Sequence, residues 1–135
     1  MTVPLNDPVR KIVDRPSLGI LATINKDGSP QTSVVWLGRE GDDVVISSEA
    51  GRLKVRNLQR DARTSLTVID PADPDHYIEL RGTATVTDDE DRRVAVLLAE
   101  KYVGPGAGDE YLALPPEVGR VVIRLTPHRI VGNLA

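Results

Sequence analysis

The chain has 135 residues, of which 40% are hydrophobic and 27% are charged, with 20 carboxylates against 17 Lys and Arg. This length suits a single domain, residues 1–135, with one core. The net charge of −3 argues against a general nucleic-acid-binding protein, which usually carries a basic surplus. The absence of cysteine excludes disulfides and thiol nucleophiles and fits a reducing cytosol. No apolar run approaches the roughly 20 residues of a membrane span, so we expect a soluble cytoplasmic protein with no membrane partner.

The first half of the chain predicts a short helix followed by three antiparallel strands. The helix covers residues 7–14 and ends at Arg15, because the residue before Pro16 is pushed out of the α region. Strands at 17–24 and 31–37 flank the turn sequence NKDG and therefore form a hairpin. A second turn at 39–43 leads into a third strand at 44–48.

The second half of the chain predicts two helices and three further strands. Residues 51–61 have helix-forming composition, 64–70 read as a strand, and 70–75 form a loop of Asp and Pro. In the long strand at 76–87, Gly82 marks a bulge or bend of the kind found where a sheet curls into a barrel. Thr87 caps a helix that runs to about Tyr102 and presents Val94, Leu97 and Leu98 to the core. The last strand covers 120–126, and Pro127 limits it before a polar tail.

The segment GRLKVRNLQRD and the two residues after it contain five of the 17 bases, namely Arg52, Lys54, Arg56, Arg60 and Arg63. At 100° per residue the four arginines fall on one side of a helix, and Val55, Leu58 and Ala62 fall on an adjacent side. Ser47 and Ser48 end the strand before this helix. A strand, serines and a helix start with bases are an arrangement that can hold a phosphate. The alternative is a solvated basic face, but five bases so close repel one another and favour an anionic ligand.

Other candidate sites carry weaker signals. The cluster of Asp70, Asp73, Asp75 and His76 could bind a hard metal, but its prolines favour a turn that connects two strands, and we expect no metal site. Trp36 either fills a core that lacks Phe or stacks on a planar ligand.

Three segments carry a resemblance to a known family. LATINKDGSPQTSVVWL, VVISSEAGRLKVRNLQRDARTSLTV and YIELRGTATV, in this order and with these spacings, resemble the split β-barrel flavin and deazaflavin reductases. These are the pyridoxine-phosphate-oxidase-like proteins, and the similarity is to their coenzyme F420-dependent branch. The resemblance implies a mainly β fold with flanking helices (α+β), in which six antiparallel strands form a split barrel like that of FMN-binding proteins. It also implies a homodimer with two cofactor sites at the subunit interface.

The resemblance also implies which residues contact the cofactor. The segment from Ser47 and Ser48 to Asn57 would hold the phosphate and tail, through Arg52, Lys54 and Asn57 with help from Arg56. Gln31 and Ser33 would approach the ring system, and Tyr77 would line the same pocket.

With no cysteine, two histidines and no metal constellation, the chain depends on a cofactor for its chemistry. The resemblance implies an oxidoreductase in which reduced F420 passes a hydride to an electron-poor small molecule. No side chain is identified as the catalytic acid. The alternatives are an FMN-dependent oxidoreductase of the same fold and a non-catalytic protein that binds a flavin or deazaflavin. The many bases between 52 and 63 suit the polyglutamate tail of F420 better than FMN.

Overall fold

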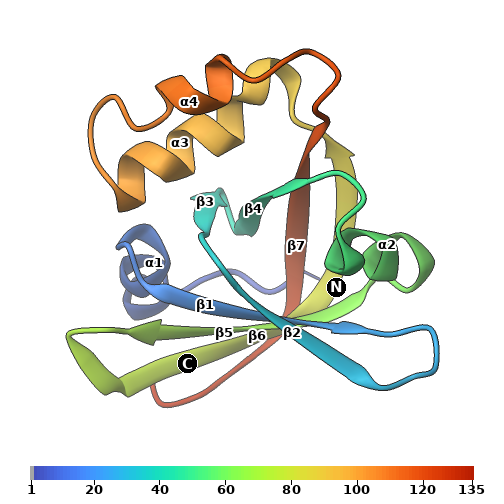
Figure 1. The fold of residues 1–135 in the computed structure, drawn as a ribbon. Helices are drawn as coiled ribbons and strands as arrows, with labels where there is room; N and C mark the ends of the chain where they lie inside the picture. The colour runs from blue at the N-terminus through green and yellow to red at the C-terminus, as the bar shows by residue number, and fades with distance from the viewer. Residues whose placement is uncertain (1) are drawn as a thin grey trace.

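The computed structural model describes residues 2–135, which fold around one seven-stranded antiparallel sheet with helices at its margins (Figure 1). The strands are β1 (Leu18–Ile24), β2 (Pro30–Val35), β3 (Gly38–Glu40), β4 (Asp43–Glu49), β5 (Arg63–Asp70), β6 (Asp73–Asp88) and β7 (Arg120–Val131). The helices are α1 (Asp7–Asp14), α2 (Leu53–Arg60), α3 (Arg93–Tyr102) and α4 (Asp109–Leu112), and a 3₁₀ turn at Glu90–Arg92 precedes α3. The strand order is β2-β1-β5-β6-β7-β4-β3.

This arrangement confirms the expected mainly β fold with flanking helices, but the count of six strands is wrong. The additional strand is β3, which lies where a turn was predicted at 39–43. Gly41 has a φ of 65°, which lets the chain reverse within a shorter turn, so that Gly38–Glu40 pair with β4. No helix within residues 2–135 is both long enough and apolar enough to cross a membrane.

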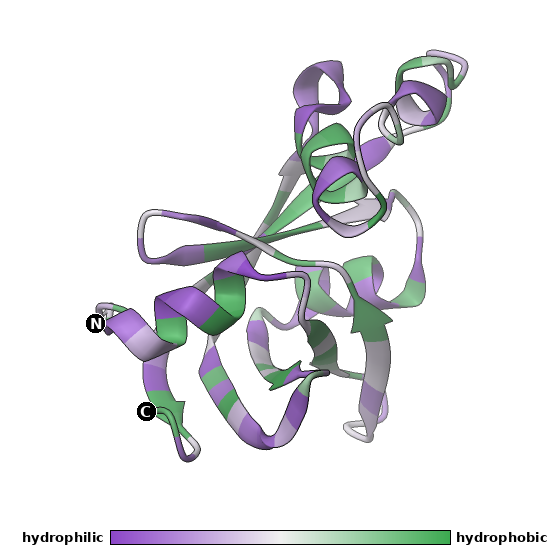
Figure 2. Ribbon diagram, turned by 90° about the vertical axis from the view of Figure 1, so that its left-hand side faces the viewer, coloured by the Kyte–Doolittle hydropathy of each residue, from purple (hydrophilic) through white to green (hydrophobic). Residues whose placement is uncertain are grey.

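The core is built from the inward-facing residues of the strands, which alternate along β1 and β5 with less buried residues. The outward residues of β5 are mostly polar, whereas those of β1 are apolar (Figure 2). Leu21, Leu66 and Leu80 lie in register on three neighbouring strands, and all three are fully buried. Leucine, isoleucine and valine supply nearly all of this core, as expected for a chain without phenylalanine. The apolar side of α2, with Val55 and Leu58, packs against the same core.

The helix α1 has the predicted bounds. The Asn6 side chain accepts a hydrogen bond from the Val9 amide at 2.9 Å and so caps its N-terminus. The helix then ends before Pro16, as expected.

The predicted start and packing of α3 are partly wrong. Strand β6 continues to Asp88, so Thr87 does not cap the helix. The N-cap position of α3 is Arg92, and the side chain that satisfies the first amides of the helix belongs to Asp89. Its two carboxylate oxygens accept hydrogen bonds from the amides of Val94 and Ala95, both at 3.0 Å. Leu97 is 48% exposed, because Ala95 and Ala99 occupy the buried side of the helix beside Val94 and Leu98.

The two longest strands extend beyond their predicted ends. Strand β6 starts at Asp73, inside the predicted loop, and β7 continues through Pro127 to Val131. The bend predicted at Gly82 is confirmed, because Arg81 pairs with Arg129 whereas Gly82 pairs with Pro127. His128 is therefore the extra residue of a β-bulge. Pro127 is tolerated at this bulge, where a regular ladder hydrogen bond is interrupted.

Gly82 is predicted to be irreplaceable for packing reasons. A Cβ atom at this position would lie 2.0 Å from the Thr126 carbonyl oxygen and 2.9 Å from its carbon, and both are backbone atoms that β7 holds in place. We expect Gly82→Ala to lower the free energy of unfolding by about 1–3 kcal/mol in chemical denaturation. Gly119→Ala is the control, because its Cβ atom would meet only the Ala50 side chain, at 3.2 Å. Equal stability of the two variants would contradict the predicted clash.

Candidate functional site

A cavity of about 250 Å³ lies between the sheet and residues of α2, α3 and α4. Its walls come from β2 and the residue after it, β4, the three helices and the first residue of β7. The lining residues are Val34, Val35, Trp36, Ser47, Lys54, Ala95, Leu98, Tyr111 and Arg120. The cavity therefore combines apolar walls with two cationic side chains and one hydroxyl group.

The two cations in this cavity, Lys54 and Arg120, are not neutralised. Neither forms an ion pair with a carboxylate within residues 2–135. Burial lowers the pKa of Lys54, and the positive charges of Arg52 and Arg120 lower it further. Because like charges disfavour the protonated form, an anion in the cavity would relieve a repulsion that the protein leaves in place.

Arg120 is held in a fixed position and keeps a free hydrogen-bond donor. One terminal nitrogen donates to the Ser47 hydroxyl at 2.7 Å, and the guanidinium lies 5.1 Å from the centre of the Tyr111 ring. Its Nε atom is buried and has no partner within the described residues. A buried donor without a partner is costly, and a ligand oxygen would satisfy it.

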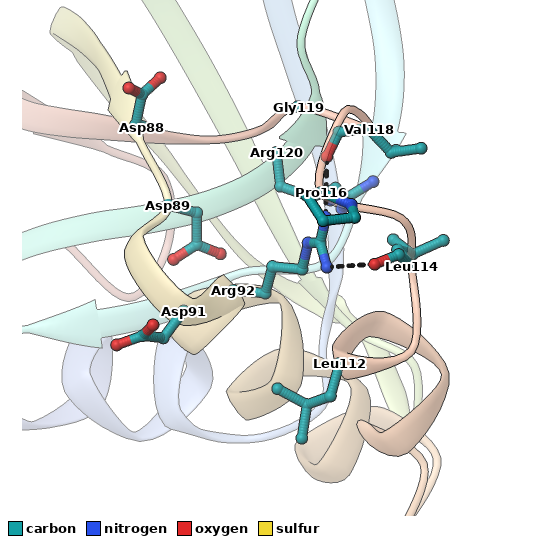
Figure 3. Close-up of a pocket in the computed structure, with 10 residues that line it drawn as sticks. All are labelled: Asp88, Asp89, Asp91, Arg92, Leu112, Leu114, Pro116, Val118, Gly119 and Arg120. Atoms are coloured by element: carbon teal, nitrogen blue, oxygen red, sulfur yellow. Dashed lines mark hydrogen bonds between the residues drawn. The ribbon is translucent and has the colours of Figure 1, made fainter.

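A second and larger space, of about 660 Å³, is also lined by Arg120 (Figure 3). Here the Arg92 guanidinium donates to four backbone carbonyls, those of Tyr111, Leu114, Pro115 and Val118, at 2.7–3.3 Å. Arg92 and the preceding Asp91 both have positive φ, at 54° and 55°, a conformation that is strained for residues other than glycine. Arg92 thereby anchors the segment between α4 and β7 and keeps Tyr111 beside Arg120.

Trp36 forms an aromatic wall of the cavity. Its ring stacks on Tyr102 with a centroid separation of 5.2 Å and an interplanar angle of 9°, and the side chain stays 39% exposed. The Tyr102 hydroxyl accepts from the Leu37 amide at 3.2 Å and donates to the Ser17 carbonyl at 2.8 Å, so the supporting ring is fixed. Trp36 is thus partly packed, and it keeps surface available to a planar ligand.

The structure brings only some of the predicted phosphate-binding residues together. Ser47 and Lys54 line the cavity. Ser48 is buried and its hydroxyl donates to the Glu49 carbonyl, while Arg52 pairs with Glu49 at 3.3 Å. Arg56 lies on α2, is exposed and does not line the cavity. Asn57 is 1% exposed, and its side-chain nitrogen donates hydrogen bonds to Thr23 and Asn25 inside the protein.

The residues predicted to lie near the ring occupy two different places. Gln31 and Ser33 lie on β2, on the same side as Val35, which lines the cavity. Tyr77 lies near the start of β6, whereas Thr87, near the end of that strand, is in register with Val122 and Ser47 beside the cavity. Tyr77 therefore does not reach the cavity of its own chain.

The five bases do not form one helical face. The helix ends at Arg60, so Arg63 begins β5, where it pairs with Asp61 at 2.8 Å, and Ala62 is exposed rather than packed. Arg60 donates to the Ile24 carbonyl and to Asn57. Of the five, only Lys54 lines the cavity.

Sequence reasoning missed Arg120, Tyr111 and Arg92. Arg120 is the first residue of β7, a strand with ordinary alternation. Arg92 and Tyr111 are 19 residues apart in the chain, and a hydrogen bond of 3.3 Å joins the Arg92 guanidinium to the Tyr111 carbonyl. No local pattern marks them, because their roles arise from contacts across the fold.

In the acidic segment at residues 70–76, Asp73 pairs with His76 at 3.1 Å, and no group of three metal-ligating side chains occurs in the described part of the chain.

The antiparallel sheet with flanking helices is that of the split β-barrel proteins, a fold family that binds flavin-type cofactors. Residues 5–133 match the pyridoxamine 5'-phosphate oxidase family, and the chain belongs to it. The structure is similar to that of an F420 reductase, with 28% identity, a TM-score of 0.79 and coverage of 94% of this chain and 98% of that one.

Two further solved structures support the fold. A conserved hypothetical protein from Mycobacterium tuberculosis is 23% identical, with a TM-score of 0.68 and coverage of 96% of this chain and 84% of that one. General Stress Protein 26 from Bacillus anthracis is 19% identical, with a TM-score of 0.68 and coverage of 92% and 89%.

The repulsion between the two cavity cations leads to a prediction for Lys54. Replacing Arg120 by Gln removes one of the positive charges that lower the Lys54 pKa, so we expect this pKa to rise toward its ordinary value. An NMR titration of the lysine side chains would measure the change. Arg129→Gln, at the far end of the same strand, should leave the Lys54 pKa unchanged. A Lys54 pKa unaffected by Arg120→Gln would show that the two charges do not interact.

Proposed function

We propose that this protein is an oxidoreductase that uses the deazaflavin coenzyme F420 to transfer a hydride to an electron-poor small molecule. The observation that carries the proposal is the pair of cavity cations, Lys54 and Arg120, which have no carboxylate partner in the described structure. The similarity to an F420 reductase over 94% of the chain supports the choice of cofactor. FMN is the alternative, since it also carries a phosphate.

The residues of the cavity fit the anionic part of such a cofactor. Lys54, the free Nε atom of Arg120 and the Ser47 hydroxyl offer donors from three different elements to one phosphate group. Trp36 offers an aromatic surface next to them for a planar ring or substrate. Arg56, which is exposed on α2 two residues after Lys54, suits the carboxylates of a longer anionic tail.

The contribution of the protein to the reaction is binding and orientation. When bound, F420 would supply the hydride, and Lys54, Arg120 and Ser47 would hold its phosphate. The fixed Arg120 and the stacked Trp36 limit the positions that a bound molecule can take. The apolar residues Val35, Ala95 and Leu98 reduce the access of water to the same space.

Binding measurements with purified protein test the proposal. We expect Lys54→Ala to weaken F420 and FMN binding by roughly 10- to 150-fold, the loss of one charge-assisted hydrogen bond, and the loss should shrink at high salt. Lys26→Ala, in the exposed β1–β2 turn, is the matched control. Arg56→Ala should weaken F420 a fewfold and leave FMN unchanged, because only F420 carries the tail. Equal affinities of wild type and Lys54→Ala for both molecules would refute the anion site.

We further propose that the protein is a homodimer whose partner subunit lies on the outer face of β1, β2, β5 and β6. On this face Ile20 is in register with Val34, and Leu18 with Ile69 and Tyr77. Val34, Leu18 and Tyr77 are 74%, 50% and 43% exposed, which is unusual for a sheet surface that faces only water. Val34 also lines the cavity, so a partner on this face would close the site and would bring its Tyr77 closer.

The dimer is tested by mass in solution. We expect sedimentation of wild type at micromolar concentration to give twice the chain mass of 14.7 kDa. Val34→Glu should shift the mass to that of one chain, because it places a charge in an apolar interface. Val103→Glu changes a residue that is 69% exposed at the end of α3 and should remain dimeric. A wild-type mass of one chain would exclude the dimer.

A further inference from the structure

A series of side-chain hydrogen bonds, here called the relay, connects α2 with β1 and β2. Arg60 donates to Asn57 Oδ1 at 3.3 Å, and Asn57 Nδ2 donates to Thr23 Oγ1 at 3.0 Å. Thr23 then donates to Gln31 Oε1 at 2.6 Å, and Gln31 Nε2 donates to Ser33 Oγ at 2.7 Å. Thr23 and Asn57 are each 1% exposed, so water does not compete at the middle of the relay.

Arg60 fixes the direction in which every hydrogen of the relay points. A guanidinium has only donors, so the Asn57 side chain must turn its oxygen to Arg60 and its nitrogen to Thr23. The Asn25 side-chain oxygen accepts from the same nitrogen at 2.9 Å and excludes the opposite orientation. The Thr23 hydroxyl therefore accepts a hydrogen bond from Asn57 and donates one to the side-chain oxygen of Gln31. The Gln31 nitrogen must then face Ser33.

The relay leaves the Ser33 hydroxyl as a donor with an unused hydrogen. Its oxygen accepts from Gln31, and its hydrogen has no acceptor within residues 2–135. Ser33 lies on the same side of β2 as Val35, which lines the cavity, and two strand residues span roughly 7 Å. A molecule with its anionic group at Lys54 and Arg120 that extends along β2 therefore meets this hydroxyl next.

We propose that Ser33 donates a hydrogen bond to a carbonyl oxygen of the bound heterocycle, and that Arg60, Asn57, Thr23 and Gln31 are positioning residues that hold Ser33 in this donor state. The inference rests on the proposed function, since F420 and FMN both carry ring carbonyls next to a chain that ends in an anion. It assigns Asn57 a role through the relay in place of direct contact with a phosphate.

A purely structural role of the relay, as an anchor for α2, gives a different result when the relay is cut. The variants Thr23→Val and Arg60→Met leave Ser33 itself unchanged but remove the constraint on its hydroxyl. Two controls match them in chemistry. Thr64→Val removes a buried hydroxyl that donates only to the Ala22 carbonyl, at 2.7 Å, and Arg63→Met removes an arginine that pairs only with Asp61.

The experiment measures the affinity for F420 and FMN and the absorbance maximum of the bound ring in wild type and each variant, with inorganic phosphate as a probe that lacks the ring. We expect Ser33→Ala, Thr23→Val and Arg60→Met each to weaken cofactor binding roughly twofold to tenfold, the effect of one hydrogen bond, and to shift the absorbance maximum alike. Phosphate affinity should not change. Thr23→Ser should restore both readouts, and the double variant Thr23→Val/Ser33→Ala should bind no more weakly than Ser33→Ala.

Two results would overturn the inference. If Thr23→Val and Arg60→Met gave the same affinities and spectra as Thr64→Val and Arg63→Met, the relay would be an anchor only. If Ser33→Ala bound as wild type does, the hydroxyl would not contact the ring. In both cases wild type still binds F420 or FMN, which separates these results from a failure of the proposed function, in which wild type binds neither and the inference falls with it.

Discussion

The pairing of β6 with β7 is the constraint on which the rest of the molecule depends. It runs from Glu79 opposite Val131 to Asp88 opposite Val121, and the close approach of Gly82 to the Thr126 carbonyl bends both strands in its middle. Strand β6 pairs on its other edge with β5, which leads to β1, and strand β7 pairs on its other edge with β4. This bend turns a flat sheet into an open barrel. It also delivers Arg120, the first residue of β7, to the side of the barrel where α2 packs.

The basic segment that stands out in the sequence is used mainly to build the protein. Arg60 secures the end of β1 and orients Asn57, Arg63 pairs with Asp61, and Arg52 pairs with Glu49. Arg52 and Arg63 are thus neutralised by carboxylates, and Arg60 donates to uncharged oxygens. What remains in the cavity is a small excess of positive charge from Lys54 and Arg120 in apolar surroundings. A low-dielectric site needs few charges to attract an anion, because each one is weakly screened.

The sequence predicts features that depend on neighbours in the chain, and it fails where distant residues meet. The α1 helix, the β1–β2 hairpin and the bend at Gly82 follow from Pro16, the NKDG turn and a lone glycine in a strand. The helical face drawn through Arg63 is wrong, because the helix ends at Arg60 and Arg63 is the first residue of β5. Strand β3 is too short to show alternation. Of the site, Ser47 and Lys54 were predictable from the strand-to-helix pattern. Arg120 was not, because its partner Ser47 lies 73 residues away, and the relay depends on the contact between Asn57 and Thr23, which are 34 residues apart.

The anchoring of the α4–β7 segment by Arg92 has a consequence for how this protein diversifies. The guanidinium recognises only backbone carbonyls, so the attachment of the segment does not depend on the identity of its side chains. Residues such as Leu112, Leu114 and Pro116 are therefore free to change during evolution while the chain path stays the same. Because Arg92 also binds the carbonyl of Tyr111 on α4, it holds in the same way a residue of the cavity wall. Side chains next to the binding site can therefore be exchanged without loss of the contacts that attach this part of the chain to the barrel.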